Sequence, residues 1–109
     1  RKDRDGEWVW DPPGQAKTFE RGRINWFGRD PDWVDELGFR GREDLEKPAG
    51  QWTRLDAFVK DDTFTYLVNG TIVNKGTDSS LKEGRILFQS EGAEIYFRRI
   101  ELLPLRDGD

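Results

Sequence analysis

The stretch TFTYLVNGTIVNK, residues 63–75, decides the fold class of this chain. Two short runs of β-branched and aromatic residues flank the pair Asn69-Gly70. Asn-Gly is favoured in a two-residue type I′ turn because both of its positions need a positive φ. We therefore predict a β-hairpin here, with strands over residues 63–68 and 71–75.

The segments on either side of the hairpin predict more strands. Residues 52–60, WTRLDAFVK, alternate apolar with mostly polar side chains. Downstream, GRILFQS (residues 84–90) and AEIYFRRIEL (residues 93–102) are joined by a turn at Glu91-Gly92. Antiparallel strands with short links are typical of an all-β sandwich or jelly roll.

The first half of the chain has no such regular pattern. Residues 1–50 are rich in Gly, Pro, Asp and Arg, and we predict a loop-rich variable region with one or two strands. Within it, Asp30 can cap a short helix near residues 31–37, and Gly38 can end it. A chain of 109 residues is one domain, so residues 51–109 supply the antiparallel strands of that same domain.

Composition excludes several kinds of chemistry. Only 34% of the residues are hydrophobic and 37% are charged, so the core must be thin. The chain has no cysteine and no histidine, which excludes disulfides, zinc-thiolate sites and Ser-His-Asp catalysis within it. The net charge of -4, with both signs interspersed, argues against nucleic acid as a partner. No apolar run is long enough for membrane insertion.

Three stretches carry a family resemblance. They are KPAGQWTRLD (residues 47–56), LVNGTIVNKGTD (residues 67–78) and GRILFQSEGAEIYFRRIELLPL (residues 84–105). In this order and spacing, residues 47–105 resemble the 3-keto-disaccharide hydrolase domain family, formerly a domain of unknown function. The resemblance implies a concanavalin-like jelly roll, an antiparallel β-sandwich with a carbohydrate site on its concave face.

The resemblance also implies a setting and an activity. Family members are bacterial proteins, periplasmic or extracellular, that act on glycosides oxidised at C3. A ketone at C3 acidifies the hydrogen on C2, and the leaving group on C1 is then beta to that ketone. A carboxylate could remove this proton while an arginine stabilises the enolate oxygen. Glu91 or Glu94 is the candidate base, and Arg98 is the candidate enolate stabiliser.

Two departures from the family pattern leave catalysis open. Arg99 stands where asparagine is common, and Glu91 lies in a turn where many members carry a histidine. A divalent metal could take the role of the arginine, but the sequence shows no ligand motif for one. The alternatives to an enzyme are a non-catalytic carbohydrate-binding module and a structural sandwich domain of a larger secreted protein.

Other residues are candidates for binding the sugar. The resemblance implies that Gln89 lies beside the concave site, and we predict that Gln89, Glu91 and Arg98 share that surface. The competing interpretation is a solvated outer face for the first two and a salt bridge for the arginine. Trp26 and Trp33 are candidate stacking platforms at the rim, with core packing as the alternative.

We expect that this chain does not close a jelly roll alone and is a partial domain. Two sheets packed face to face need enough strands to cover each other's apolar sides. The predicted strands are too few for this, and an uncovered sheet leaves edge groups free to pair with another chain. The missing cover would come from an N-terminal segment or from a second copy of the chain.

Overall fold

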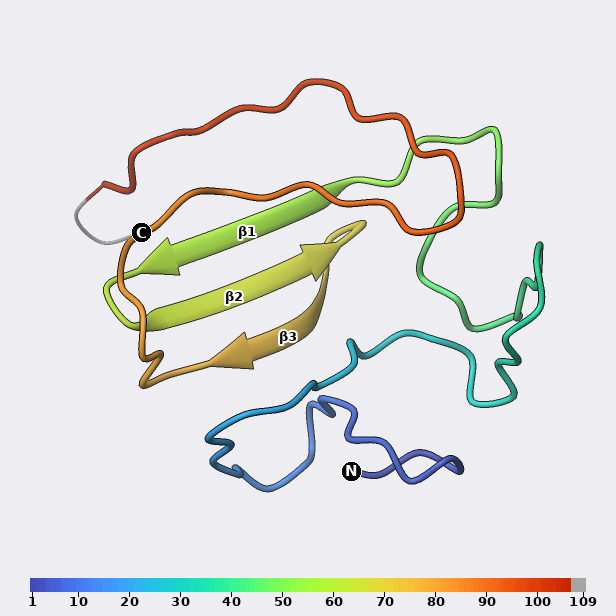
Figure 1. Ribbon diagram of the computed structural model, residues 1–109, viewed down its shortest axis with the longest axis horizontal. Helices are drawn as coiled ribbons and strands as arrows, with labels where there is room; N and C mark the ends of the chain where they lie inside the picture. The colour runs from blue at the N-terminus through green and yellow to red at the C-terminus, as the bar shows by residue number, and fades with distance from the viewer. Residues whose placement is uncertain (107–109) are drawn as a thin grey trace.

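The computed structural model describes residues 1–106 and shows an all-β chain. Within these residues there is one sheet of three strands, β1 (Leu55–Lys60), β2 (Thr63–Val68) and β3 (Thr71–Gly76), in the order β1-β2-β3 with antiparallel neighbours (Figure 1). Long loops before and after the sheet make up the rest of the described chain. The predicted all-β class is therefore confirmed, and the strands lie where the hairpin pattern placed them.

The β2–β3 hairpin turns at Asn69 and Gly70, whose φ angles are 48° and 85°. Both values are positive, as a type I′ turn requires, which confirms the turn predicted from the Asn-Gly pair. The register then shifts between Tyr66 and Leu67, so that β3 has one extra residue. This β-bulge explains why two consecutive residues of β3, Val73 and Asn74, are both buried.

β1 joins β2 through a turn at Asp61 and Asp62, and Asp61 has a φ of 53°. The pairing runs without interruption from Leu55 opposite Val68 to Lys60 opposite Thr63. Residues 52–54, which the sequence pattern included in this strand, precede the ladder. β1 is an edge strand of the sheet, because its second edge has no hydrogen-bonded strand among the described residues.

The core is small, as the composition requires. Its buried hydrophobic residues among those described are Val9, Val68 and Val73, and the last is only 1% exposed. The N-terminal segment contributes Val9 to this core, and an isolated parallel bridge pairs Val9 with Asn25 of the same segment. It then joins the sheet where the Phe27 N–H donates to the Val73 carbonyl oxygen at 2.9 Å.

The helix predicted near residues 31–37 is wrong, and no helix occurs within residues 1–106. Asp30 explains the error, because its Oδ1 accepts a hydrogen bond from the Asp32 N–H at 2.8 Å and its carbonyl accepts one from the Trp33 N–H at 3.0 Å. These bonds form turns in place of a helical ladder. Leu37 is 101% exposed, so the apolar face of such a helix would have nothing to pack against. The described part accordingly has no helix that could span a membrane.

The two strands expected over residues 84–90 and 93–102 are also absent as strands. These segments run extended beyond β1 (Figure 1) and meet through the rings of Phe88 and Phe97, whose centroids are 5.0 Å apart. From residue 82 to 105 they make no backbone-to-backbone hydrogen bond with any described residue. A second sheet is therefore not formed by residues 1–106, and the jelly roll stays a prediction.

Candidate functional site

A cleft of about 630 Å³ lies between two loop segments and the sheet. One wall comes from residues 25–33 and the other from residues 38–49, with Val68 and Val73 contributed by β2 and β3. A smaller pocket beside it shares Trp26, Arg29 and Trp33 with the cleft. The cleft is therefore built mainly by loops, and the three-stranded sheet supports them.

Two aspartates hold these loops together. The Asp30 N–H donates to Asp44 Oδ1 at 2.7 Å, and the Gly41 N–H donates to Asp44 Oδ2 at 2.8 Å. In return, Asp30 Oδ2 accepts from the Glu43 N–H at 3.2 Å. Backbone hydrogen bonds from Asp32 and then Glu43 lower the pKa of the Asp30 carboxyl, because they favour its charged form. We call this pair of carboxylates with their backbone donors the aspartate clamp.

Two glycines let the loops approach this closely. A Cβ on Gly41 would lie 2.1 Å from the Asp30 Cβ, and a Cβ on Gly28 would lie 2.2 Å from the Leu45 Cδ1. Gly28 also has a φ of 96°, which disfavours any other residue. The Leu45 N–H donates to the Gly28 carbonyl oxygen at 3.0 Å, so the two walls meet through backbone.

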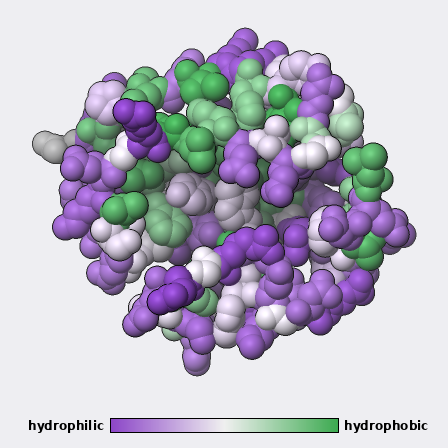
Figure 2. All heavy atoms as spheres, in the orientation of Figure 1, coloured by the Kyte–Doolittle hydropathy of each residue, from purple (hydrophilic) through white to green (hydrophobic). Residues whose placement is uncertain are grey.

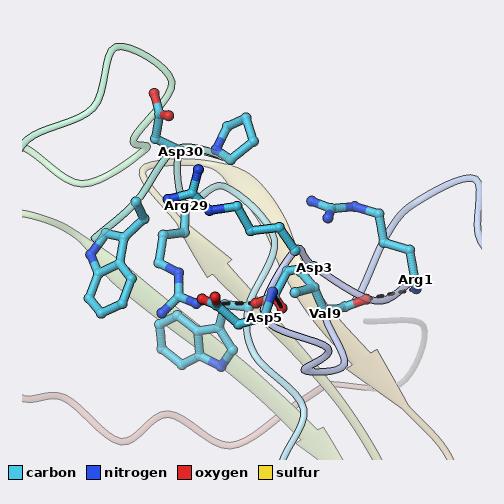
Figure 3. A pocket seen from close by; sticks show the side chains of 10 residues that line it. Arg1, Asp3, Asp5, Val9, Arg29 and Asp30 are labelled. Atoms are coloured by element: carbon cyan, nitrogen blue, oxygen red, sulfur yellow. Dashed lines mark hydrogen bonds and ion pairs between the residues drawn. The ribbon is translucent and has the colours of Figure 1, made fainter. Parts of the chain in front are cut away.

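Aromatic rings line the cleft. Trp26 is 39% exposed, and its ring contacts Tyr66 of β2 with centroids 6.1 Å apart. The Arg29 guanidinium lies 4.1 Å from the centre of the Trp33 ring. Arg29 is also held by an ion pair with Asp3 at 3.6 Å, and Figure 3 shows these two residues side by side in the smaller pocket. An arginine stacked on a tryptophan keeps its N–H groups available at the edge of the plane.

The cleft also carries charge of both signs. Its cations are Arg29, Arg40 and Lys47, and its anions are Asp44 and Glu46. Arg40 donates from Nη1 to the Glu46 carbonyl oxygen. Asp44 is used by the aspartate clamp, whereas the Glu46 side chain makes no hydrogen bond or ion pair with another described residue. Glu46 is therefore the carboxylate in the cleft that remains free to act on a ligand.

The predicted site residues fall into two groups. Trp26 and Trp33 both line the cleft. Gln89, Glu91 and Glu94 are exposed on the segment after β3 and do not line it. Nothing in the described chain brings Gln89 or Glu91 into contact with the tryptophans, so a shared concave surface stays a prediction.

Arg98 and Glu94 each have a local partner. The Arg98 guanidinium lies 4.0 Å from the centre of the Trp52 ring, in place of the salt bridge considered for it. The Glu94 carboxylate accepts a hydrogen bond from the Tyr96 hydroxyl, and this bond raises the pKa of Tyr96. Arg99 has a φ of 51°, which interrupts the extended backbone of this segment. Within the described residues, no three His, Cys, Asp or Glu side chains are grouped to hold a metal.

Sequence reasoning missed the charged residues of the cleft. Arg29 belongs to WFGRD (residues 26–30), and the other charged residues of the cleft belong to FRGREDLEK (residues 39–47): Arg40, Asp44, Glu46 and Lys47. The sequence pattern assigned both stretches only to the loop-rich region of residues 1–50. A usable signal was present in each, because an aromatic residue, a glycine and charged residues stand close together there.

A comparison with known families decides the assignment. The profile described as the 3-keto-alpha-glucoside-1,2-lyase-like domain matches residues 10–103. The chain belongs to this family. The lyase-like domain thus includes both the cleft and the extended segments after β3, and it begins well before the residues that first suggested it. No curated protein and no solved structure matches the chain.

Proposed function

We propose that this lyase-like domain binds a glycoside oxidised at C3 in the cleft and cleaves its glycosidic bond. One observation carries the proposal: the family match over residues 10–103 contains every residue that lines the cleft. The cleft volume of about 630 Å³ falls within the usual range for sites that hold small molecules. It therefore has room for a ligand of disaccharide size.

The rings supply the binding surface. Trp26 offers an exposed face, and a pyranose presents C–H groups that pack on such a face. Trp33 is covered by Arg29, so the sugar meets the guanidinium edge there in place of the ring. That edge can donate hydrogen bonds to hydroxyl or ketone oxygens. The two tryptophans therefore have different roles, one in stacking and one in supporting a hydrogen-bond donor.

The reaction needs a base and a positive charge. Removal of the C2 proton gives an enolate, whose collapse breaks the C1–O bond and leaves a double bond between C1 and C2. The leaving oxygen takes up a proton, so the leaving sugar departs with a free hydroxyl. Glu46 is the free carboxylate of the cleft and is our candidate base. Arg40 and Lys47 line the same cleft and are our candidates to stabilise the enolate oxygen. The alternative residues are on the exposed segment after β3, with Glu91 or Glu94 as the base and Arg98 as the enolate stabiliser.

The decisive experiment compares a 3-keto-disaccharide with the same disaccharide unoxidised. We expect release of the leaving sugar from the first and none from the second. Glu46→Gln should abolish release while leaving binding intact, and Glu91→Gln and Glu94→Gln should leave it unchanged. The reverse pattern would assign the chemistry to the segment after β3. No release from either sugar would overturn catalysis.

A second candidate is a carbohydrate-binding module without catalysis. It is favoured by one observation, because Glu91, Glu94 and Arg98 are exposed and do not line the cleft that contains the tryptophans. Binding of both disaccharides with no release of product would select it. Absence of binding as well would leave a structural role for the domain.

A further inference from the structure

The described chain exposes far more surface than a folded monomer of its mass. Its accessible surface is 10060 Å². A monomer of 12.7 kDa is expected to expose about 6,200 Å². Its radius of gyration, 15.2 Å, likewise exceeds the roughly 13 Å expected for a compact domain of this length. The excess is roughly 3,900 Å² per chain, and each partner of a permanent interface buries about 1,000–2,500 Å², so the chain has enough uncovered surface for one.

Most of the exposed large hydrophobic residues belong to β1 and residues 84–105, whose surface we call the C-terminal face. Large apolar side chains are exposed all along it, among them Val59 (56%), Leu87 (81%) and Ile100 (62%). Figure 2 shows hydrophobic residues gathered over the half of the molecule where β1 and the extended segments lie. Exposed apolar surface of this extent on a soluble chain marks an interaction site.

Part of the backbone of this face is without hydrogen-bond partners in the described chain. Residues 82–105 make no backbone-to-backbone hydrogen bond within the described chain, although they run extended. β1 has one open edge beside them. An extended segment and an open strand edge both favour pairing with another strand, because each presents a row of N–H and C=O groups. The partner of this face is therefore a polypeptide in extended conformation.

Charge favours a second copy as that partner. The whole chain has a net charge of -4, so two copies repel one another at most orientations. Residues 84–105 are an exception, since three arginines (Arg85, Arg98, Arg99) balance three glutamates (Glu91, Glu94, Glu101). Two such neutral faces can approach without net repulsion. Each copy also provides both an extended segment and an open edge, so a twofold axis would satisfy both at once.

We propose that the C-terminal face is the interface between two copies of this chain. Sedimentation or light-scattering measurements from micromolar to millimolar concentration should show a species of twice 12.7 kDa. Amide exchange over residues 93–103 should slow as this species forms. A chain that stays monomeric throughout would overturn the proposal. Open-ended growth without a two-copy species would overturn it as well.

A matched pair of variants locates the interface. Ile100→Glu puts a charge on the C-terminal face, and Leu37→Glu makes the same kind of change at a fully exposed site outside it. Both side chains are exposed in one copy, so neither change should disturb the hairpin, which far-UV circular dichroism can verify. We expect at least tenfold weaker pairing for the first variant and wild-type pairing for the second. Equal pairing by both would place the contact elsewhere and overturn the assignment.

Discussion

The side chain of Asn69 joins the hairpin turn to the wall of the cleft. Its Nδ2 donates to the Leu45 carbonyl oxygen at 2.7 Å, and its Oδ1 accepts from the Arg54 N–H at 3.0 Å. The residue that makes the β2–β3 turn therefore also fixes the loop that carries Glu46. A turn residue thus controls both the sheet and the geometry of the candidate site.

We expect Asn69→Asp to separate these two roles. Aspartate tolerates the positive φ of this turn and keeps an acceptor for the Arg54 N–H. It loses the donor to Leu45, which should cost about 1 kcal/mol in the free energy of unfolding. Urea titration measures this cost, and ligand affinity should fall with it. Unchanged affinity would show that the turn does not position the cleft.

The glycine of the aspartate clamp gives a steric prediction. Gly41→Ala puts a Cβ 2.1 Å from the Asp30 Cβ, so the loops must separate. We expect a loss of roughly 1–3 kcal/mol, as for other overpacked sites. Gly84→Ala is the matched control, because a Cβ there meets nothing within 4 Å. Thermal unfolding of both variants makes the comparison, and equal effects would contradict the close approach.

The aspartate clamp should weaken in acid. Because the folded state lowers the pKa of Asp30, the clamp stabilises the fold above the ordinary aspartate pKa of 3.8. That contribution should disappear as the pH falls through the lower folded-state value. Unfolding free energies measured from neutral pH downward should therefore decline more steeply for the wild type than for Asp30→Asn. Parallel curves would show that Asp30 does not contribute.

The tryptophans of the cleft should report binding. Titration with a 3-keto-disaccharide is expected to quench fluorescence, and Trp26→Ala should weaken affinity by about tenfold for the loss of one stacking face. Trp8→Ala is a matched control outside the cleft, where Lys17 lies 4.2 Å from the Trp8 ring centre. Equal loss in both variants would indicate general destabilisation and return Trp26 to a structural role.

The parts predicted correctly from sequence depend on neighbouring residues. Asn69 and Gly70 adopt the positive φ angles that their types allow, so the hairpin follows from local chemistry. The prediction of a helix near residues 31–37 was wrong for an equally local reason, because the Asp30 side chain accepts a hydrogen bond from the Asp32 N–H in its own turn. A helix-propensity pattern does not account for this competition between a side chain and the helix for backbone hydrogen bonds.

The parts that were missed depend on distant residues. The cleft forms because Asp44 accepts a hydrogen bond from the Asp30 N–H and Asp30 accepts one from the Glu43 N–H across a long loop, which no periodic pattern indicates. Arg98 stacks on Trp52, and the three strands separate these two residues in the sequence, so this contact could not be predicted either. Residues 84–102 have strand-like composition, but a strand also needs a neighbouring strand that hydrogen-bonds to it. Sequence alone does not show whether that partner is present.

The short turns of the sheet set the order of events during folding. β1, β2 and β3 follow one another through the turns at Asp61-Asp62 and Asn69-Gly70, so every ladder contact closes a small loop. Such hairpins form in microseconds, at a rate independent of protein concentration. Pairing of two C-terminal faces is bimolecular and must come later. A refolding experiment should therefore show a fast phase whose rate is independent of protein concentration and a slow phase whose rate falls on dilution.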